Sequence, residues 1–156
     1  MKRNVIPTML GTILVTALSI GFTPAANAQS ACSTAGAAGQ WGYSYSGTIY
    51  LPSGQVLLAA VGRITEDQTG HFIGHQTRNV GGSSGEEVLR GVIRVNPDCS
   101  GTSVVRIYQG GKLQRTSYLN MVYVNGMKQA KWIFEALILP DKTNVPVVAT
   151  LDMSRL

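Results

Sequence analysis

From residue 41 onward, apolar and polar positions alternate along the chain with a period of two. In residues 41–51, Trp41, Tyr43 and Tyr45 occupy every second position, and small polar residues stand at positions 44, 46 and 48. Successive residues of a strand point to opposite faces, so this pattern is typical of a β-strand with one apolar face. Similar runs bounded by turn residues predict about eight strands, at residues 41–51, 56–65, 71–79, 87–96, 102–109, 113–124, 130–139 and 145–152.

Short turn signals separate these segments. Gly110-Gly111 and Asn125-Gly126 are typical of tight hairpins, residues 96–101 (NPDCSG) form a dense turn signal, and residues 81–85 (GGSSG) predict a loop. No segment has a convincing amphipathic helical pattern. Short links favour antiparallel neighbours, and eight such strands can close into a barrel without exposed edges. The predicted fold is therefore all-β, a single antiparallel up-and-down barrel. A two-sheet β-sandwich is the alternative, although the long crossovers of a Greek key are missing.

Two strands show which side chains should share a face. Within residues 87–96, the positions of Leu89 and Ile93 form an apolar face, and Arg90 and Arg94 lie on the other. Within residues 130–139, we expect one set of alternate residues to face the core and the other set to face water. The first set is Trp132, Phe134, Ala136 and Ile138, and the second is Lys131, Ile133, Glu135 and Leu137. A reversed register would instead turn Glu135 into an apolar lumen, where its pKa would rise and it could serve as an acid or base.

The N-terminus has the pattern of an export signal. Lys2 and Arg3 precede the apolar residues 13–22, and Ala26-Asn27-Ala28 supplies a small-x-small cleavage pattern. We expect cleavage after Ala28, which gives a signal peptide at 1–28, a flexible lead-in at 29–40 and a barrel domain at 41–156. An uncleaved anchor is disfavoured because the apolar run is short for a span of about 20 residues. Lipidation of Cys32 is also disfavoured, because a polar Gln stands where a lipobox needs an aliphatic residue.

The predicted export determines the redox environment of the two cysteines, Cys32 and Cys99. In an oxidising compartment, periplasmic or extracellular, a pair of cysteines usually forms one disulfide. Two free thiols and a metal-binding pair are the rival interpretations. No further cysteine or suitably spaced histidine supports a metal site.

The charge pattern argues against nucleic-acid binding. The formal net charge of the chain is +5, and two of the 13 basic residues belong to the signal segment. The others are scattered, whereas a nucleic-acid groove needs a basic stripe with interleaved aromatic residues. We expect no nucleic-acid partner and no membrane span in the mature protein, and the sequence leaves the oligomeric state open.

Three stretches resemble a group of small secreted bacterial proteins, mostly uncharacterised. These stretches are Cys32 with residues 39–47 (GQWGYSYSG), residues 59–65 (AAVGRIT) with Asp67 and Gly70, and residues 91–102 (GVIRVNPDCSGT). The group looks like calycin-type or allene-oxide-cyclase-like β-barrels. The resemblance covers roughly residues 32–102 and implies a barrel with a Cys32–Cys99 disulfide. It carries no catalytic residue that can be transferred, and residues 112–156 match only in pattern.

The candidate chemistry is sparse. His71 and His75 would lie about 13 Å apart on one face of an extended strand, which is too far to share a metal ion. Glu86 and Glu87 are neighbours in the chain and should point to opposite faces, so they are a poor acid/base pair. No phosphate loop, dinucleotide fingerprint or metal-ligand cluster is present, so we expect no metal and no cofactor.

Aromatic strands supply the best candidate for a binding site, although they could equally fill the core of a small barrel. The candidate ligand-binding residues are Trp41, Tyr43, Tyr45, Trp132, Phe134 and Glu135. The leading hypothesis is a non-enzymatic module that holds a small apolar or amphipathic molecule in the barrel mouth. One alternative is an envelope or surface interaction protein. Another is a cyclase- or isomerase-like enzyme acting on an apolar substrate.

Overall fold

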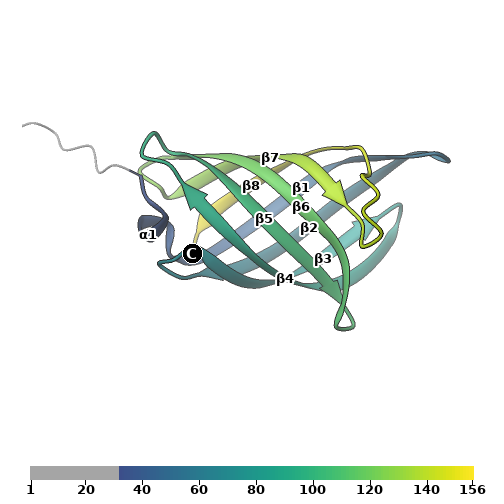
Figure 1. Ribbon diagram of the computed structural model, residues 1–156, viewed down its shortest axis with the longest axis horizontal. Coiled ribbons are helices and arrows are strands. Elements are labelled where there is room, and N and C mark those ends of the chain that lie inside the picture. The colour runs from purple at the N-terminus through teal and green to yellow at the C-terminus, as the bar shows by residue number, and fades with distance from the viewer. Residues whose placement is uncertain (1–31) are drawn as a thin grey trace, which may run out of the picture.

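The computed structural model describes residues 32–156, which form a closed barrel of eight antiparallel strands in up-and-down order (Figure 1). The strands are β1 (Gly39–Leu51), β2 (Gly54–Glu66), β3 (His71–Val80), β4 (Ser83–Val95), β5 (Ser100–Gln109), β6 (Lys112–Val124), β7 (Gln129–Ile138) and β8 (Val147–Arg155). Because β1 pairs with both β2 and β8, the sheet has no free edge. The predicted up-and-down barrel is confirmed and the sandwich is excluded. The predicted signal peptide at 1–28 lies outside the described residues.

The barrel has two different ends. The turns β1–β2, β3–β4 and β5–β6 and the longer β7–β8 connection lie at one end, which we call the open end. The helix α1 (Thr34–Ala37) and the C-terminus lie at the other, the closed end (Figure 1).

The turn between β3 and β4 is shorter than the loop predicted at 81–85. β4 already begins at Ser83, so only Gly81 and Gly82 connect the two strands. Both have positive φ, 57° and 93°, which a two-residue hairpin of the primed type requires and glycine adopts at little cost. Residues 83–85 therefore belong to a strand, and Arg78 faces Gly85 across the pair.

A β-bulge in β7 shifts the alternation that the sequence predicts. Leu119 of β6 pairs with Phe134, whereas the preceding Tyr118 pairs with Ala136, so Glu135 is the extra residue. Trp132 and Phe134 face inward as predicted. Beyond the bulge the parity changes and Leu137 is buried. The predicted inward positions of Ala136 and Ile138 and the outward position of Leu137 are therefore wrong.

The helix α1 covers the closed end. Ser33 caps it, since its Oγ accepts a hydrogen bond from the Gly36 amide at 3.0 Å. Ala37 and Trp41 are both fully buried, and Trp41 Nε1 donates to the Ala37 carbonyl at 2.8 Å. Residues 34–40, part of the lead-in predicted at 29–40, thus contain α1 and the start of β1.

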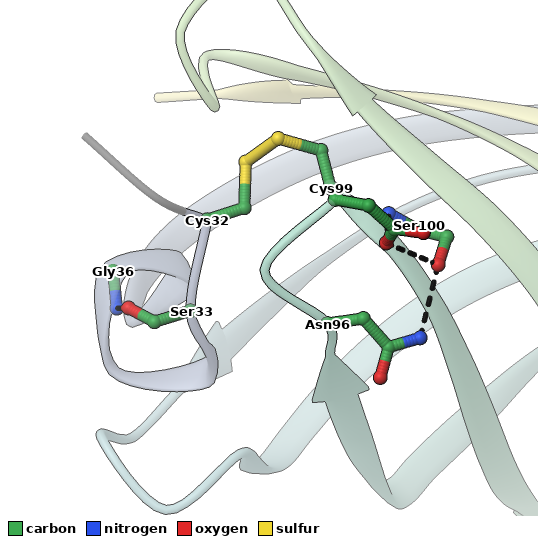
Figure 2. Close-up of a disulfide and its surroundings, with 7 residues drawn as sticks. Cys32, Ser33, Gly36, Asn96, Cys99 and Ser100 are labelled. Carbon is green, nitrogen blue, oxygen red and sulfur yellow. Dashed lines mark hydrogen bonds between the residues drawn. A yellow bond between two sulfur atoms is a disulfide. The ribbon is translucent and has the colours of Figure 1, made fainter. Parts of the chain in front are cut away.

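A disulfide ties α1 to the barrel. Cys32 is bonded to Cys99 in the turn after β4, and their Cα atoms lie 4.9 Å apart (Figure 2). In the same turn, Asn96 Nδ2 donates to Ser100 Oγ at 2.9 Å (Figure 2). The disulfide prediction is confirmed, and free thiols or a metal pair at these positions are excluded.

Arg155 at the end of β8 tethers the same helix from the other chain end. Its guanidinium donates to the carbonyls of Gly36 at 2.7 Å and Ala38 at 3.0 Å, and its Cζ lies 4.7 Å from the Trp41 ring centroid. The closed end is therefore held by a disulfide, by hydrogen bonds from side chains to backbone carbonyls and by a cation–π contact.

Two inward-facing glycines make room for large rings in the interior. A Cβ at Gly91 would lie 2.5 Å from the Phe72 ring, and one at Gly62 would lie 2.5 Å from the Tyr43 hydroxyl. Side chains of this size fill the lumen of an eight-stranded barrel only where the opposing position is small.

Candidate functional site

A cluster of polar side chains lies inside the barrel toward the open end. Gln76 and Arg78 come from β3, Glu87 from β4 and Arg115 from β6. Gln76, Glu87 and Arg115 are buried, and Arg78 is half-buried. We call these four residues the mouth cluster. Buried charges are costly unless they are paired, so the geometry of the pairing decides what the cluster can do.

Glu87 is the centre of the mouth cluster. Its Oε1 accepts from Arg115 Nη1 at 2.6 Å, and its Oε2 accepts from Arg115 Nη2 at 2.7 Å and from Gln76 Nε2 at 2.5 Å. Burial alone would raise the pKa of Glu87, but the hydrogen bonds and charge of Arg115 hold it below its usual range. Burial opposes the charge of Arg115 too, yet the same pairing raises its pKa. The two residues therefore form a fully ionised, bidentate pair.

Arg78 is bound less tightly. Its Nη1 lies 3.6 Å from Glu87 Oε1, which is too long for a hydrogen bond, and its buried Nε has no hydrogen-bond partner among the described residues. Burial and the neighbouring Arg115 lower the pKa of Arg78. The mouth cluster thus holds two guanidinium groups and one carboxylate, and Arg78 shares the Glu87 carboxylate at a longer distance than Arg115 does.

Tyr43 extends this network inward. Its hydroxyl donates to Gln76 Oε1 at 2.8 Å, which fixes the amide so that its nitrogen points to Glu87. Burial, with the nearby Tyr45 and Glu87, raises the pKa of Tyr43 well above its usual value, so the hydroxyl is a donor throughout the physiological range. Tyr43 and Gln76 position the carboxylate of Glu87.

A recess of about 250 Å³ opens above the mouth cluster. One wall is polar and the other is apolar. The polar wall is made by Arg78, Glu87, Gln109, Gln114 and Arg115, and the apolar wall by Ile49, Leu51, Leu137, Leu139 and Val145. Leu137 reaches this wall because the bulge at Glu135 turned it inward, and Leu139 and Val145 lie in the β7–β8 connection.

A smaller cavity of about 50 Å³ lies deeper, below Arg115. Its lining is mostly apolar, and Arg115 borders both this cavity and the recess. The rings of Tyr45 and Phe134 meet there with centroids 5.4 Å apart. At about 30 Å³ per water-sized group, the cavity has room for only one or two atoms, so the aromatic residues mainly fill the core.

The structure brings together four of the six residues predicted to bind a ligand. Tyr43, Tyr45, Trp132 and Phe134 all line the deep cavity. Trp41 lies instead under α1 at the closed end. Glu135 is exposed on the barrel exterior, where its Oε2 accepts a hydrogen bond from Asn120 at 3.2 Å. The outward register expected for Glu135 is therefore the observed one, and this carboxylate does not enter the lumen.

The histidines also lie on the exterior. His71 and His75 are exposed on β3, and His71 Nδ1 is 2.9 Å from Thr69 Oγ1. Within residues 32–156, no group of three or more histidine, cysteine, aspartate or glutamate side chains is arranged to hold a metal ion. Glu86 points outward while Glu87 points inward, as their adjacency predicted.

The mouth cluster was not predicted from the sequence, although strand parity contained the signal. Gln76 and Arg78 stand an even number of residues from Phe72, Glu87 is two residues before Leu89, and Arg115 shares its parity with Leu119. Each therefore had to share the face of a buried apolar residue. The polar character of these residues suggested solvent exposure, but their mutual pairing is what permits burial.

A second buried carboxylate lies at the closed end. Glu66 is 3% exposed, and neither of its oxygens has a hydrogen-bond partner among the described residues. Burial and the nearby Asp67 raise its pKa to about 7, although Arg155 opposes this shift. Glu66 lines neither the recess nor the deep cavity.

The fold and the site define the class of this protein as a small disulfide-bonded up-and-down barrel, closed at one end and recessed at the other. No family model matches the chain, and no curated protein is significantly similar to it. Among residues 32–156, no helix has the length and apolar character needed to cross a membrane.

Proposed function

We propose that this exported protein is a non-enzymatic binding module that holds a small amphipathic molecule in the recess at the open end. The observation that carries the proposal is the composition of the recess, in which an apolar wall faces a buried charged wall across about 250 Å³. Ligand sites are typically concave and mostly apolar, with a few well-placed polar groups.

The size of the recess limits the ligand. At about 30 Å³ per water-sized group, 250 Å³ holds roughly eight non-hydrogen atoms. A six-carbon chain with a small polar head has this size. Its chain would lie against Leu137, Leu139 and Val145, and its head would face the mouth cluster.

Binding is favoured over a cyclase- or isomerase-like activity by the state of the two buried carboxylates. A general acid or base works best with a pKa near the working pH and with access to the substrate. Glu87 borders the recess, but its three hydrogen bonds keep it ionised. Glu66 has a suitable pKa, about 7, but it lies at the closed end. An envelope interaction through the exterior would not use the recess at all.

The proposal is tested by a methyl NMR titration of the oxidised mature protein with 1-hexanol, hexanoate and hexylammonium. We expect at least one of these probes to shift the methyl signals of Leu137, Leu139 and Val145 saturably, because their side chains form the apolar wall. Leu139→Gln should weaken this binding, whereas Val148→Gln on the exterior, where Val148 is 60% exposed, should leave it unchanged. Absence of saturable shifts at the wall with all three probes would overturn the proposal.

A further inference from the structure

The mouth cluster has an imbalance of charge within a largely buried site. Two guanidinium groups, of Arg78 and Arg115, border the recess together with one carboxylate, that of Glu87. Among residues 32–156, no other Lys, Arg, Asp or Glu side chain lines the recess. The recess therefore has an excess of one positive charge, in an environment where an uncompensated charge is costly.

The hydrogen bonds show which cation carries the excess. Arg115 and Glu87 satisfy each other through two parallel bonds, and Gln76 occupies a further acceptor site of Glu87. Arg78 stands 3.6 Å from the same carboxylate without a hydrogen bond. A guanidinium has five N–H donors in a planar fork, so Arg78 retains donors for a further acceptor.

We infer that the recess selects a ligand with a single carboxylate, which Arg78 binds while the apolar tail packs on Leu137, Leu139 and Val145. This inference rests on the proposed function and adds the chemical class of the ligand. A monocarboxylate brings the charge of the mouth cluster to zero, and its two oxygens match the planar fork of a guanidinium. A cationic head would face two guanidinium groups and is selected against.

Glu87 has a defined part in this selection. Glu87 bonds to both terminal nitrogens of Arg115 and makes no hydrogen bond to Arg78, so Arg78 is the less satisfied guanidinium of the recess. The ligand therefore has one preferred orientation, with its head at β3 and its tail toward the β7–β8 connection.

The test compares dissociation constants for hexanoate, 1-hexanol and hexylammonium, measured by NMR titration of the oxidised mature protein at pH 7 and low salt. We expect hexanoate to bind at least about tenfold more tightly than 1-hexanol, because a charge-assisted bond is about twice as strong as a neutral one. Hexylammonium should bind more weakly than either. Arg78→Gln should lower the affinity for hexanoate more than the affinity for 1-hexanol, so that the preference for hexanoate is lost. Arg106→Gln, which removes the same charge from the exterior of β5, should have no effect.

The outcomes separate this inference from the proposed function. Equal affinities for hexanoate and 1-hexanol, or an equal loss of hexanoate binding in Arg78→Gln and Arg106→Gln, would overturn the role of Arg78 while the binding module stands. If none of the three probes binds the recess, both proposals fail. Should Arg78→Gln not fold, Arg78→Lys retains the charge but loses the fork, and the wild-type ranking of the three probes decides by itself.

Discussion

The geometry of the mouth cluster implies that removing the charge of Glu87 and removing that of Arg115 have unequal effects on the free energy of unfolding. Glu87→Gln removes the one carboxylate and leaves Arg78 and Arg115 buried without a counter-charge. Arg115→Met removes one guanidinium, and Glu87 can still pair with Arg78, whose Nη1 already lies 3.6 Å away. Both substitutions keep the size of the side chain close to the original, so the difference between them reports charge and not volume.

The magnitudes follow from the pairing. Breaking a buried pair by removing one partner costs about 3–5 kcal/mol, and we expect Glu87→Gln to fall in this range. Arg115→Met loses two charge-assisted hydrogen bonds but leaves a neutral cluster, so we expect about 1–3 kcal/mol. Two exposed neighbours, Glu86 and Arg106, provide controls, since Glu86→Gln and Arg106→Met should change the free energy of unfolding by no more than about 0.5 kcal/mol.

Urea denaturation at pH 7 measures these free energies, and its pH dependence supplies a second criterion. The pKa of Glu87 lies below the ordinary glutamate value of 4.5 in the folded protein. Its stabilising contribution is therefore complete above that ordinary value and is lost as the pH falls through the folded-state pKa. The penalty of Glu87→Gln should shrink in acid. A larger cost for Arg115→Met than for Glu87→Gln would refute the assignment of Arg78 as the more weakly paired cation that can replace Arg115 beside Glu87.

Three further predictions concern the rest of the barrel. Burial raises the pKa of Glu66 from 4.5 to about 7, so the free energy of unfolding of the wild type should fall by up to about 3 kcal/mol as the pH rises from 4.5 to 7. Glu66→Gln should abolish that fall, and a variant with the same pH profile of denaturation as the wild type would contradict this prediction. The double variant Cys32→Ser/Cys99→Ser opens a disulfide that spans 67 residues and should lose about 4 kcal/mol in chemical denaturation, whereas an unchanged midpoint would show that the tether contributes nothing. Trp132→Ala should lower the free energy of unfolding by about 3–5 kcal/mol, whereas Ile133→Thr should lower it much less because Ile133 is 52% exposed. The reverse order would show that the two faces of β7 have been assigned the wrong way round.

Strand positions and barrel topology could be predicted because they depend on local patterns. The period of two in residues 41–51 and the short turns at Gly110-Gly111 and Asn125-Gly126 reappear in the structure as β1 and two hairpins. Two cysteines in a chain whose N-terminus has the pattern of an export signal were likewise enough to predict the disulfide.

The features that the sequence did not predict depend on contacts between distant strands. The bulge at Glu135 interrupts a regular alternation without any glycine or proline to mark it, and only the pairing of β6 with β7 reveals it. The short α1 is too small for a helical period, and it is fixed by Ser33 and by the contact with Trp41.

The mouth cluster was missed for a different reason. Each of its charged residues, taken alone, is more often exposed than buried. Glu87 and Arg115 are 28 residues apart in the chain, and their burial becomes favourable only once the barrel brings them together. The parity of each strand is enough to place each residue on the inner face, but it does not show which of these residues pair with one another.

The most direct test of the account is a crystal structure of the oxidised mature protein soaked with hexanoate. We predict ligand density in the recess at the open end, with the carboxylate within hydrogen-bond distance of Arg78 and the carbon chain on Leu139 and Val145. Ligand density only on the barrel exterior, or a recess that holds water alone at saturating hexanoate, would contradict the account.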